Sequence, residues 1–257
     1  MELNFEGFYR FVRDELNVDL NAYKEKQLKR RIATVMKSSG ALTLEDYSEL
    51  IASDEVIRNK FLDYITINVT EFYRNKDIFT DFEFILRDYL NRQFKNIKIW
   101  SAACSIGAEP YSLAMILDKN NIKTNEKIIA TDIDDNILKK AKDGVFKDFE
   151  IKNLDKKDLD KYFIEKENKY YIKDNIKGMV SFKKHDLVLD KYQKGFHAII
   201  CRNVIIYLKS ETKDEIYKKF NESLVKGGIL FTGATEAIYN PKEFGFKKIS
   251  TFIYEKI

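Results

Sequence analysis

The chain of 257 residues has few of the side chains that form covalent or metal-bound centres. Its two thiols, Cys104 and Cys201, do not make a disulfide framework. His185 and His197 are too few and too scattered for us to expect a metal site. No apolar run with a basic flank opens the chain, and none reaches the roughly 18 residues of a membrane span. We therefore expect a soluble, cytoplasmic protein.

An excess of charge of one sign is also missing. The 45 Lys and Arg residues nearly balance the 41 Asp and Glu residues, and the net charge is +4. This balance gives no general indication of nucleic-acid binding, although local clusters still matter. A hydrophobic content of 44% with 14% aromatic residues is enough for a core and argues against disorder.

One stretch, residues 97–116, organises the interpretation of the rest. Its sequence, IKIWSAACSIGAEPYSLAMI, begins with an apolar run and continues with a loop of small residues. A helical pattern follows, with Glu109 and Pro110 at its start. Small residues let a ligand approach the backbone, and a helix N-terminus offers free N–H groups. The stretch predicts a strand, a ligand-binding loop and a helix.

A second apolar run, Lys127–Thr131, ends in Asp132. A carboxylate at the tip of the second strand of such a unit accepts hydrogen bonds from the hydroxyls of a ribose. Asp132 could instead be a solvated loop acid, but its position favours the ribose. Gly107 stands alone in the preceding loop, which lacks the G-x-G-x-x-G spacing that a pyrophosphate needs. A nucleoside cofactor without phosphates is therefore expected.

The chain divides into a helical part and an α/β part. We predict four helices within residues 1–67, a loop and connecting helix over 68–96, and a mainly parallel sheet covered on both faces within 97–257. The strands expected are Ile97–Ala102, Lys127–Thr131, Phe196–Cys201 and Gly228–Thr232, followed by an edge hairpin of Phe246–Ile249 and Phe252–Tyr254.

Residues 162–183 break this alternation. They contain short β-type runs, Tyr170–Ile172 and Met179–Phe182, separated by turn residues. The pattern predicts a small antiparallel insertion of about three strands. Two local caps are also expected: Asn75 at the start of the connecting helix and Asp134 at the helix after the second strand.

Polar residues in two apolar stretches are further candidates. Asn68, Thr70 and Arg74 lie in INVTEFYR, where binding a ligand and capping helices are equally compatible with the pattern. Asn203 follows a predicted buried strand, and ligands bind at the carboxyl ends of such strands. Tyr207 lies just beyond, where packing with a satisfied hydroxyl is the commoner role.

Residues 24–37 concentrate positive charge, with one acid, Glu25, among six basic side chains. These are Lys24, Lys26, Lys29, Arg30, Arg31 and Lys37. A solvated helix face is the commoner explanation of such a run. The alternative is a docking surface for an acidic partner or for phosphates.

In combination these stretches resemble the CheR family of chemotaxis receptor methyltransferases. The shared pieces, in order, are a YKEKQLKRR helix, NVTEFYR, WSAACSIGAEPYSLAM, ATDID, a β insertion, CRNVIIY and GATE. Each piece is weak alone, but their order and spacing cover nearly the whole chain. The resemblance implies an α/β, Rossmann-like S-adenosylmethionine-dependent methyltransferase domain with a small antiparallel β insertion, preceded by an all-helical N-terminal domain.

The resemblance also implies site residues, position by position. Arg74 and Tyr207 match the residues nearest the reacting centre. Glu109 matches the acid that meets the ammonium group of the cofactor, and Asp132 matches the ribose acid. The other matched cofactor-binding positions are Asn68, Thr70, Asp186, Leu187, Asn203 and Val204, of which Asp186 departs from the Asn that relatives often have.

The reaction implied is methyl transfer from S-adenosylmethionine to glutamate side chains of methyl-accepting chemotaxis receptors, with S-adenosylhomocysteine as product. A glutamate, with a pKa of ~4.3, is already ionised at neutral pH and needs no general base. The lack of a catalytic His or Cys constellation therefore fits. Under this hypothesis Arg74 holds the incoming carboxylate, and Tyr207 positions it or the cofactor.

Partners follow from the same resemblance. The methylation helices of such receptors are rich in Glu, so Lys26, Lys29, Arg30 and Arg31 become docking candidates. The β insertion could capture a short peptide at the receptor C-terminus by strand addition. We expect a monomer that is recruited to receptor clusters at the membrane and binds neither nucleic acid nor metal.

Two other functions stay open on the sequence. A nucleic-acid methyltransferase would use the basic helix, but residues 203–206 lack the proline-aromatic pattern of a site that methylates a base amino group. A non-catalytic module that binds the cofactor for signalling is the third class. The presence of both Arg74 and Tyr207 speaks against it.

Overall fold

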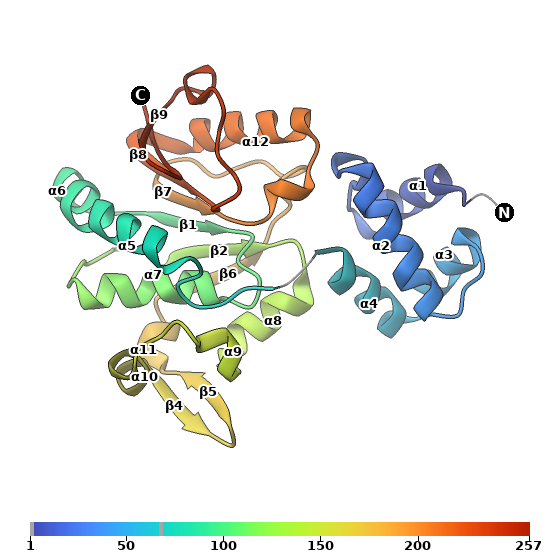
Figure 1. Cartoon of the computed structure of the whole chain (residues 1–257), viewed down its shortest axis with the longest axis horizontal. Helices are drawn as coiled ribbons and strands as arrows, with labels where there is room; N and C mark the ends of the chain where they lie inside the picture. The colour runs from blue at the N-terminus through green and yellow to red at the C-terminus, as the bar shows by residue number, and fades with distance from the viewer. Residues whose placement is uncertain (1–2, 67–68) are drawn as a thin grey trace. The chain divides into compact units, whose positions relative to one another are not determined.

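The computed structural model describes residues 3–66 and 69–257 (Figure 1). The chain forms two compact units. One comprises Met1–Asn68 together with Tyr207–Lys213, and the other comprises Val69–Ile206 and Asp214–Ile257. The sequence did not indicate that residues 207–213 would join the N-terminal helices.

The first unit is built from the four predicted helices, which are confirmed. They are α1 (Phe5–Leu16), α2 (Glu25–Ser38), α3 (Leu44–Ser53) and α4 (Glu55–Thr66), with a 3-10 turn, η1 (Leu20–Ala22), between the first two. Thr43 opens α3 with a capping box, because its side chain accepts from the Asp46 N–H and Asp46 accepts in return. The buried rings of Phe8, Tyr47 and Phe61 contact one another and form the centre of the unit.

The segment Tyr207–Lys213 joins this unit through backbone pairing. The Lys24 N–H donates to the Tyr207 carbonyl at 2.8 Å, and the Lys209 N–H donates to the Ala22 carbonyl at 2.9 Å. Tyr23 and Leu208 lie opposite each other in an antiparallel bridge, with Leu208 buried. Residues far apart in the sequence therefore close one structural element.

The second unit is organised around a seven-stranded sheet, and the predicted α/β class is confirmed. In spatial order its strands are β6 (Val180–Lys184), β2 (Ile128–Asp132), β1 (Ile99–Ala102), β7 (Phe196–Cys201), β8 (Leu224–Thr232), β10 (Ile253–Lys256) and β9 (Phe246–Ser250). The first five are parallel, and β10 and β9 add the predicted antiparallel hairpin. The carboxyl ends of the five parallel strands consequently lie along one edge.

The predicted insertion needs a correction. The small antiparallel sheet has the order β3-β5-β4, formed by β3 (Val145–Phe146), β5 (Lys169–Ile172) and β4 (Phe163–Lys166). The expectation that Met179–Phe182 belongs to it is wrong, because β6 pairs in parallel with β2, Val180 opposite Ile128. A short edge strand has the same β-type composition in either sheet, so the pattern could not assign it.

Helices cover both faces of the large sheet. The helical segments of this unit are α5 (Lys76–Ile85), the π-helical η2 (Leu86–Leu90), α6 (Asn91–Gln93), α7 (Ala108–Lys119), α8 (Asp135–Asp143), α9 (Asp148–Ile151), α10 (Lys156–Tyr162), α11 (Asp174–Lys177), η3 (Ile205–Tyr207), α12 (Ser210–Ser223) and η4 (Pro241–Phe244). The parts of η3 and α12 that fall within residues 207–213 belong to the first unit. Phe79 and Phe82 of α5 contact Phe231 of β8. On the other face, Trp100 of β1 contacts Phe220 of α12. Successive strand residues face opposite sides, so β1 is buried on both.

Two further expectations concern single residues and spans. Asn75 does precede α5, but its side chain makes no capping bond and its φ is +60°. Asp134 caps α8 as predicted, accepting from the N–H groups of Asn136 and Ile137. In the described parts of the chain, no helix is long and apolar enough to cross a bilayer.

Candidate functional site

Polar residues gather in the loops that follow the parallel strands. The loops are Ala103–Gly107 after β1, Ile133–Asp134 after β2, Arg202–Val204 after β7 and Gly233–Glu236 after β8. The segment Val69–Asn75 precedes α5 and contacts the loop after β7 through Arg74 and Asn75. This is the edge of an open α/β sheet at which ligands bind.

The loop after β1 has an unusual backbone. Ala103 and Ser105 have φ values of +62° and +50°, and Gly107, at +88°, precedes α7. A Cβ on Gly107 would lie 3.1 Å from the Tyr111 ring and 3.2 Å from the Ala141 methyl group. Glycine is needed there for both conformation and space. The small residues thus let the loop lie close to α7 and α8.

Asp132, at the end of β2, is buried and fixes this loop. Its Oδ2 accepts from the Ser105 N–H at 2.8 Å, and its Oδ1 accepts from the Asp134 N–H at 3.2 Å. Burial raises the pKa of the Asp132 carboxyl to about 6, against the lowering effect of these N–H groups. Each oxygen keeps acceptor capacity for a ligand hydroxyl.

Glu109, in the first turn of α7, is buried beside β1. Its Oε1 accepts from the Ser101 hydroxyl at 2.7 Å, and its Oε2 lies 3.7 Å from Nη1 of Arg202. Burial raises the pKa of Glu109 to about 7, although Arg202 and Ser101 favour the charged form. A cationic ligand group would favour that charged form further.

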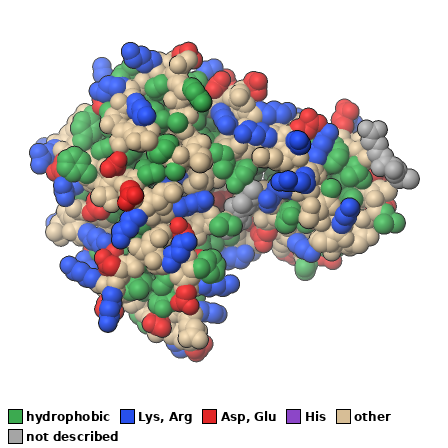
Figure 2. All heavy atoms as spheres, viewed as in Figure 1, with side chains coloured by type: hydrophobic (Ala, Val, Ile, Leu, Met, Phe, Trp, Pro, Cys, Tyr) green, Lys and Arg blue, Asp and Glu red, His purple; other side chains and the backbone are tan. Residues whose placement is uncertain are grey.

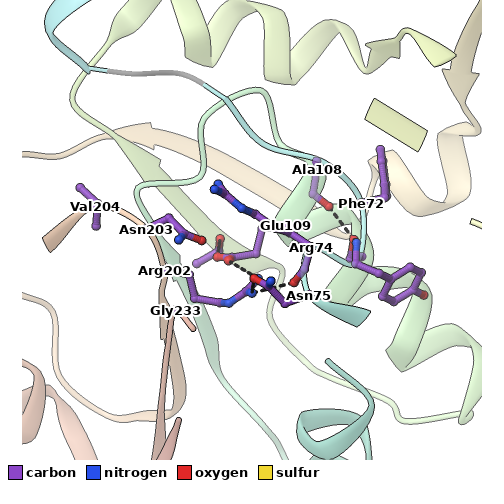
Figure 3. A network of polar contacts seen from close by, with 12 residues as sticks. Phe72, Arg74, Asn75, Ala108, Glu109, Arg202, Asn203, Val204 and Gly233 are labelled. Atoms are coloured by element: carbon purple, nitrogen blue, oxygen red, sulfur yellow. Dashed lines mark hydrogen bonds and ion pairs between the residues drawn. The ribbon is translucent and has the colours of Figure 1, made fainter. Parts of the chain in front are cut away.

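Arg202 joins the loop after β7 to the Val69–Asn75 segment (Figure 3). Its Nη2 donates to the Arg74 carbonyl at 2.6 Å and to Oδ1 of Asn75 at 3.1 Å. The Arg74 guanidinium itself donates to the Val69 carbonyl at 2.9 Å. The Asn75 side chain therefore binds Arg202, which explains why it does not cap α5.

Buried backbone contacts anchor the same segment. The Phe72 side chain is fully buried, and its N–H donates to the Glu150 carbonyl at 2.8 Å. The Tyr73 N–H donates to the Ser112 hydroxyl of α7 at 3.1 Å. Phe72 and Tyr73 thus fix the backbone next to Arg74, whose side chain is half-buried.

The loop after β7 turns sharply at Asn203, whose φ is +61°. Four N–H groups, those of Asn203, Val204, Ile206 and Gly233, donate to the buried carboxylate of Glu236. The Asn203 Oδ1 atom is buried and has no hydrogen-bond partner among the described residues. Sequence reasoning gave Glu236 no role, since only its place after the last parallel strand distinguished it.

The remaining candidates are placed as follows. Asp186 and Leu187 follow β6 and are buried, and Oδ1 of Asp186 accepts from the Val188 and Leu189 N–H groups at 2.7 and 3.3 Å. Asn has the same Oδ1 acceptor, so this turn is compatible with either residue. Thr70 is half-buried. Asn68 lies outside the described residues.

Tyr207, expected near the reacting centre, belongs to the first unit, where its carbonyl accepts from the Lys24 N–H. The docking candidates lie on α2 of the same unit, and Figure 2 shows Lys and Arg side chains on the face in view. Lys26 and Arg30 are exposed, and Lys29 pairs with Glu25 at 2.6 Å. Arg31 stacks on the Tyr64 ring and donates to the Tyr64 carbonyl, so part of its role is structural.

Several groups of the second unit are chemically suited to hold an S-adenosyl cofactor. The Ser105 hydroxyl oxygen and Oδ1 of Asn203 are buried polar atoms without a partner in the described structure, and both lie in loops of this edge. Glu109 would hold an ammonium group and Asp132 a ribose, since carboxylates suit both. The residues fit the cofactor.

A parallel sheet with a small-residue loop, two buried acids and no glycine triad suits a nucleoside cofactor without phosphates, such as S-adenosylmethionine. Comparison with known families is more specific. Residues 68–253 match the description "CheR methyltransferase, SAM binding domain", and residues 3–66 match "CheR methyltransferase, all-alpha domain". The chain belongs to the CheR methyltransferase family, as the sequence resemblance predicted, and S-adenosylmethionine is its cofactor.

Relatives match over most or all of their length. The chain is 37% identical over 257 residues to the chemotaxis protein methyltransferase of Listeria monocytogenes, covering 100% of this chain and 98% of that protein. It is 29% identical over 245 residues to that of Escherichia coli, covering 91% and 84%. A TehB-like methyltransferase structure from Corynebacterium glutamicum aligns over 66% of this chain and 83% of that one, with 12% identity and a TM-score of 0.39.

Proposed function

We propose that the protein methylates glutamate side chains of methyl-accepting chemotaxis receptors, using S-adenosylmethionine. The observation that carries the proposal is that Arg202 joins the Arg74 backbone to Glu109 in a chain of the CheR family. Full-length relatives named chemotaxis protein methyltransferase support the pathway. The product would be a glutamate methyl ester, which chemotactic adaptation uses to adjust receptor output.

The cofactor would supply a methyl group on a positively charged sulfur, which a carboxylate can attack directly. The protein's residues bind and orient. Glu109 would hold the ammonium end, Asp132 the ribose, and Asp186 and Leu187 the region of the base. Thr70, Asn203 and Val204 would complete the cofactor contacts, with Asn68.

Arg74 would hold the incoming glutamate. Its guanidinium can form paired hydrogen bonds with a carboxylate, which fixes the angle of attack. The backbone around it is anchored by Phe72 and by Arg202, so its position is set before substrate arrives. Tyr207 would orient the carboxylate or the cofactor. No proton transfer is required, because the substrate is ionised at neutral pH.

The decisive experiment is transfer of radiolabelled methyl from S-adenosylmethionine to membranes that contain chemoreceptors. We expect label on the receptors that is released as methanol by mild alkali, as a methyl ester requires. Receptors with Gln or Ala in place of the methylation-site glutamates are the control and should stay unlabelled. Label that resists alkali, or that appears on nucleic acid, would exclude glutamate esterification.

We further propose that receptors recruit the enzyme to the membrane at two places. The exposed Lys26 and Arg30 would meet the Glu-rich methylation helices. The outer strand of the small sheet, β4, would pair with a receptor C-terminal peptide, and Ile164, 57% exposed on β4, offers an apolar contact. Fluorescence anisotropy with peptides from receptor C-termini tests the second contact. Binding that persists with Ile164→Asp would argue against β4.

A further inference from the structure

Glu236 is a buried acid at the edge of the sheet where the cofactor loops lie. Glu236 lies in the loop that follows β8, and it is 4% exposed. One carboxylate oxygen, Oε1, accepts from the Val204 N–H at 3.1 Å and the Ile206 N–H at 3.3 Å. The other, Oε2, accepts from the Asn203 N–H at 2.5 Å and the Gly233 N–H at 2.9 Å.

These hydrogen bonds stabilise the turn at Asn203–Ile206 through a side chain. Asn203 has a left-handed backbone, and its own N–H and those of Val204 and Ile206 further along the turn all donate to Glu236. Buried N–H groups are costly when unpaired. The single carboxylate of Glu236 accepts from three donors of this loop and, through the Gly233 N–H, ties them to the loop after β8.

The loop after β8 is shaped to admit this carboxylate. A Cβ on Gly233 would lie 2.2 Å from Oε2 of Glu236 and 2.9 Å from the Asn203 nitrogen. The absence of a side chain at Gly233 is therefore what lets the acid reach the turn. With each oxygen accepting two N–H bonds, Glu236 has no free lone pair with which to remove a substrate proton.

We infer that Glu236 is a positioning residue for the cofactor. Its carboxylate fixes the turn at Asn203–Ile206, and thereby aims the unpartnered Asn203 Oδ1 and the Val204 backbone at the bound cofactor. This inference rests on the assignment of Asn203 and Val204 as cofactor contacts in the proposed function. It assigns to Glu236 neither substrate contact nor proton transfer.

The test is Glu236→Gln in the full-length protein, measured in two ways. Gln would present an amide group to two of the four donors, so the turn should loosen. Hydrogen–deuterium exchange of the peptide covering residues 203–207 should accelerate, while β8 itself stays protected. Calorimetric affinity for S-adenosylhomocysteine should fall by about tenfold, which corresponds to about 1.4 kcal/mol.

Two controls separate positioning from general damage. Thr235→Ala changes the exposed neighbour and should leave both readouts unchanged. Asp158→Asn breaks another buried carboxylate contact, the pair with Lys119 at 2.5 Å, and should lower the melting temperature without weakening product binding. Gly233→Ala, which crowds the Glu236 carboxylate, should reproduce the effects of Glu236→Gln. It replaces Glu236→Gln in the test if Glu236→Gln does not fold.

The outcomes distinguish this inference from the proposed function. Unchanged exchange at 203–207, or unchanged product affinity in a folded Glu236→Gln or Gly233→Ala variant, would overturn the positioning role. Both measurements use S-adenosylhomocysteine and no receptor. A wild-type protein that binds this ligand but does not methylate receptors would therefore refute the proposed substrate and leave the role of Glu236 standing.

Discussion

At the scale of single residues, Arg202 is the side chain that joins the site. Its guanidinium lies between the rings of Phe79 and Phe231, with Cζ 4.9 Å from each ring centroid. Contacting two aromatic faces while Nη2 donates two hydrogen bonds and Nη1 lies near Glu109 suits the planar group of Arg and not the ammonium of Lys. Arg202 therefore fixes the backbone of Arg74 while its charge stays close to Glu109.

Arg74 is the residue whose loss should separate chemistry from binding. Arg74→Ala removes the group that would orient the substrate carboxylate, so we expect receptor methylation to slow by about 100-fold, as when one fixed donor is removed from a reacting centre. Affinity for S-adenosylhomocysteine should fall much less. Arg74→Lys, which keeps the charge without the paired geometry, should lie between. Calorimetry that finds cofactor binding abolished in Arg74→Ala would contradict the orienting role.

Glu109 should make cofactor binding depend on pH. With its pKa raised to about 7 by burial, the carboxylate that would pair with the ammonium group is largely protonated at pH 6 and ionised at pH 8. The ionised fraction, and with it the affinity for S-adenosylhomocysteine, should rise by about tenfold over this range. Calorimetry on the wild type and on Glu109→Gln provides the comparison. A wild-type profile as flat as that of the variant would exclude this role.

The Glu109 carboxyl should affect the stability of the ligand-free protein in the opposite direction, lowering it as the pH rises. Because the folded-state pKa of Glu109, about 7, lies above its ordinary value of 4.5, the carboxyl stabilises the folded state fully below pH 4.5. This stabilisation is lost as the pH rises through 7. Without ligand, the wild type should therefore lose more stability than Glu109→Gln between pH 5 and pH 8. Urea unfolding at the two pH values measures the difference.

At the scale of elements, α2 is the helix that should set receptor affinity. Lys26 and Arg30 are exposed, whereas Arg31 contacts Tyr64 of α4, so reversing the charge of Arg31 would also disturb packing. We expect Lys26→Glu combined with Arg30→Glu to slow receptor methylation by about tenfold at low salt and less at high salt. Lys60→Glu, an exposed position on α4, is the matched control.

Cofactor affinity should be the same in the charge-reversed α2 protein and the wild type, because the second unit is unchanged. Equal methylation rates at low salt would remove docking through α2 from the proposal.

Elements specified by neighbouring residues were predictable from the sequence. The capping box at Thr43 and the cap at Asp134 depend on residues two or three positions away, and both are present. Contacts across the fold were not predictable. Asn75 looks like a cap, but Arg202, more than 120 residues further on, takes its side chain. Glu236 accepts hydrogen bonds from N–H groups about 30 residues earlier in the sequence, and no local sequence pattern predicts such a partner.

At the scale of the whole molecule, the first unit is assembled from two separate parts of the chain. Residues 207–213 complete it through the Lys24–Tyr207 and Ala22–Lys209 backbone bonds. We therefore expect that a protein expressed as two fragments, 1–66 and 69–257, will copurify through a tag on the shorter one. Leu208→Asp, which places a charge at a buried position of the pairing, should weaken the association. Fragments that separate on a sizing column would contradict this expectation.

The two-part construction of the first unit also limits how chimeras of this family can be made. A graft that replaces only residues 1–66 with those of a relative would leave the host's 207–213 segment facing a foreign Ala22–Lys24 edge. A transplant of the intact first unit must therefore carry both pieces, although they are separated by about 140 residues of sequence. The first unit is thus encoded discontinuously, and recombination at a single crossover would divide it. If receptors dock on α2 as proposed, receptor preference would be divided with it.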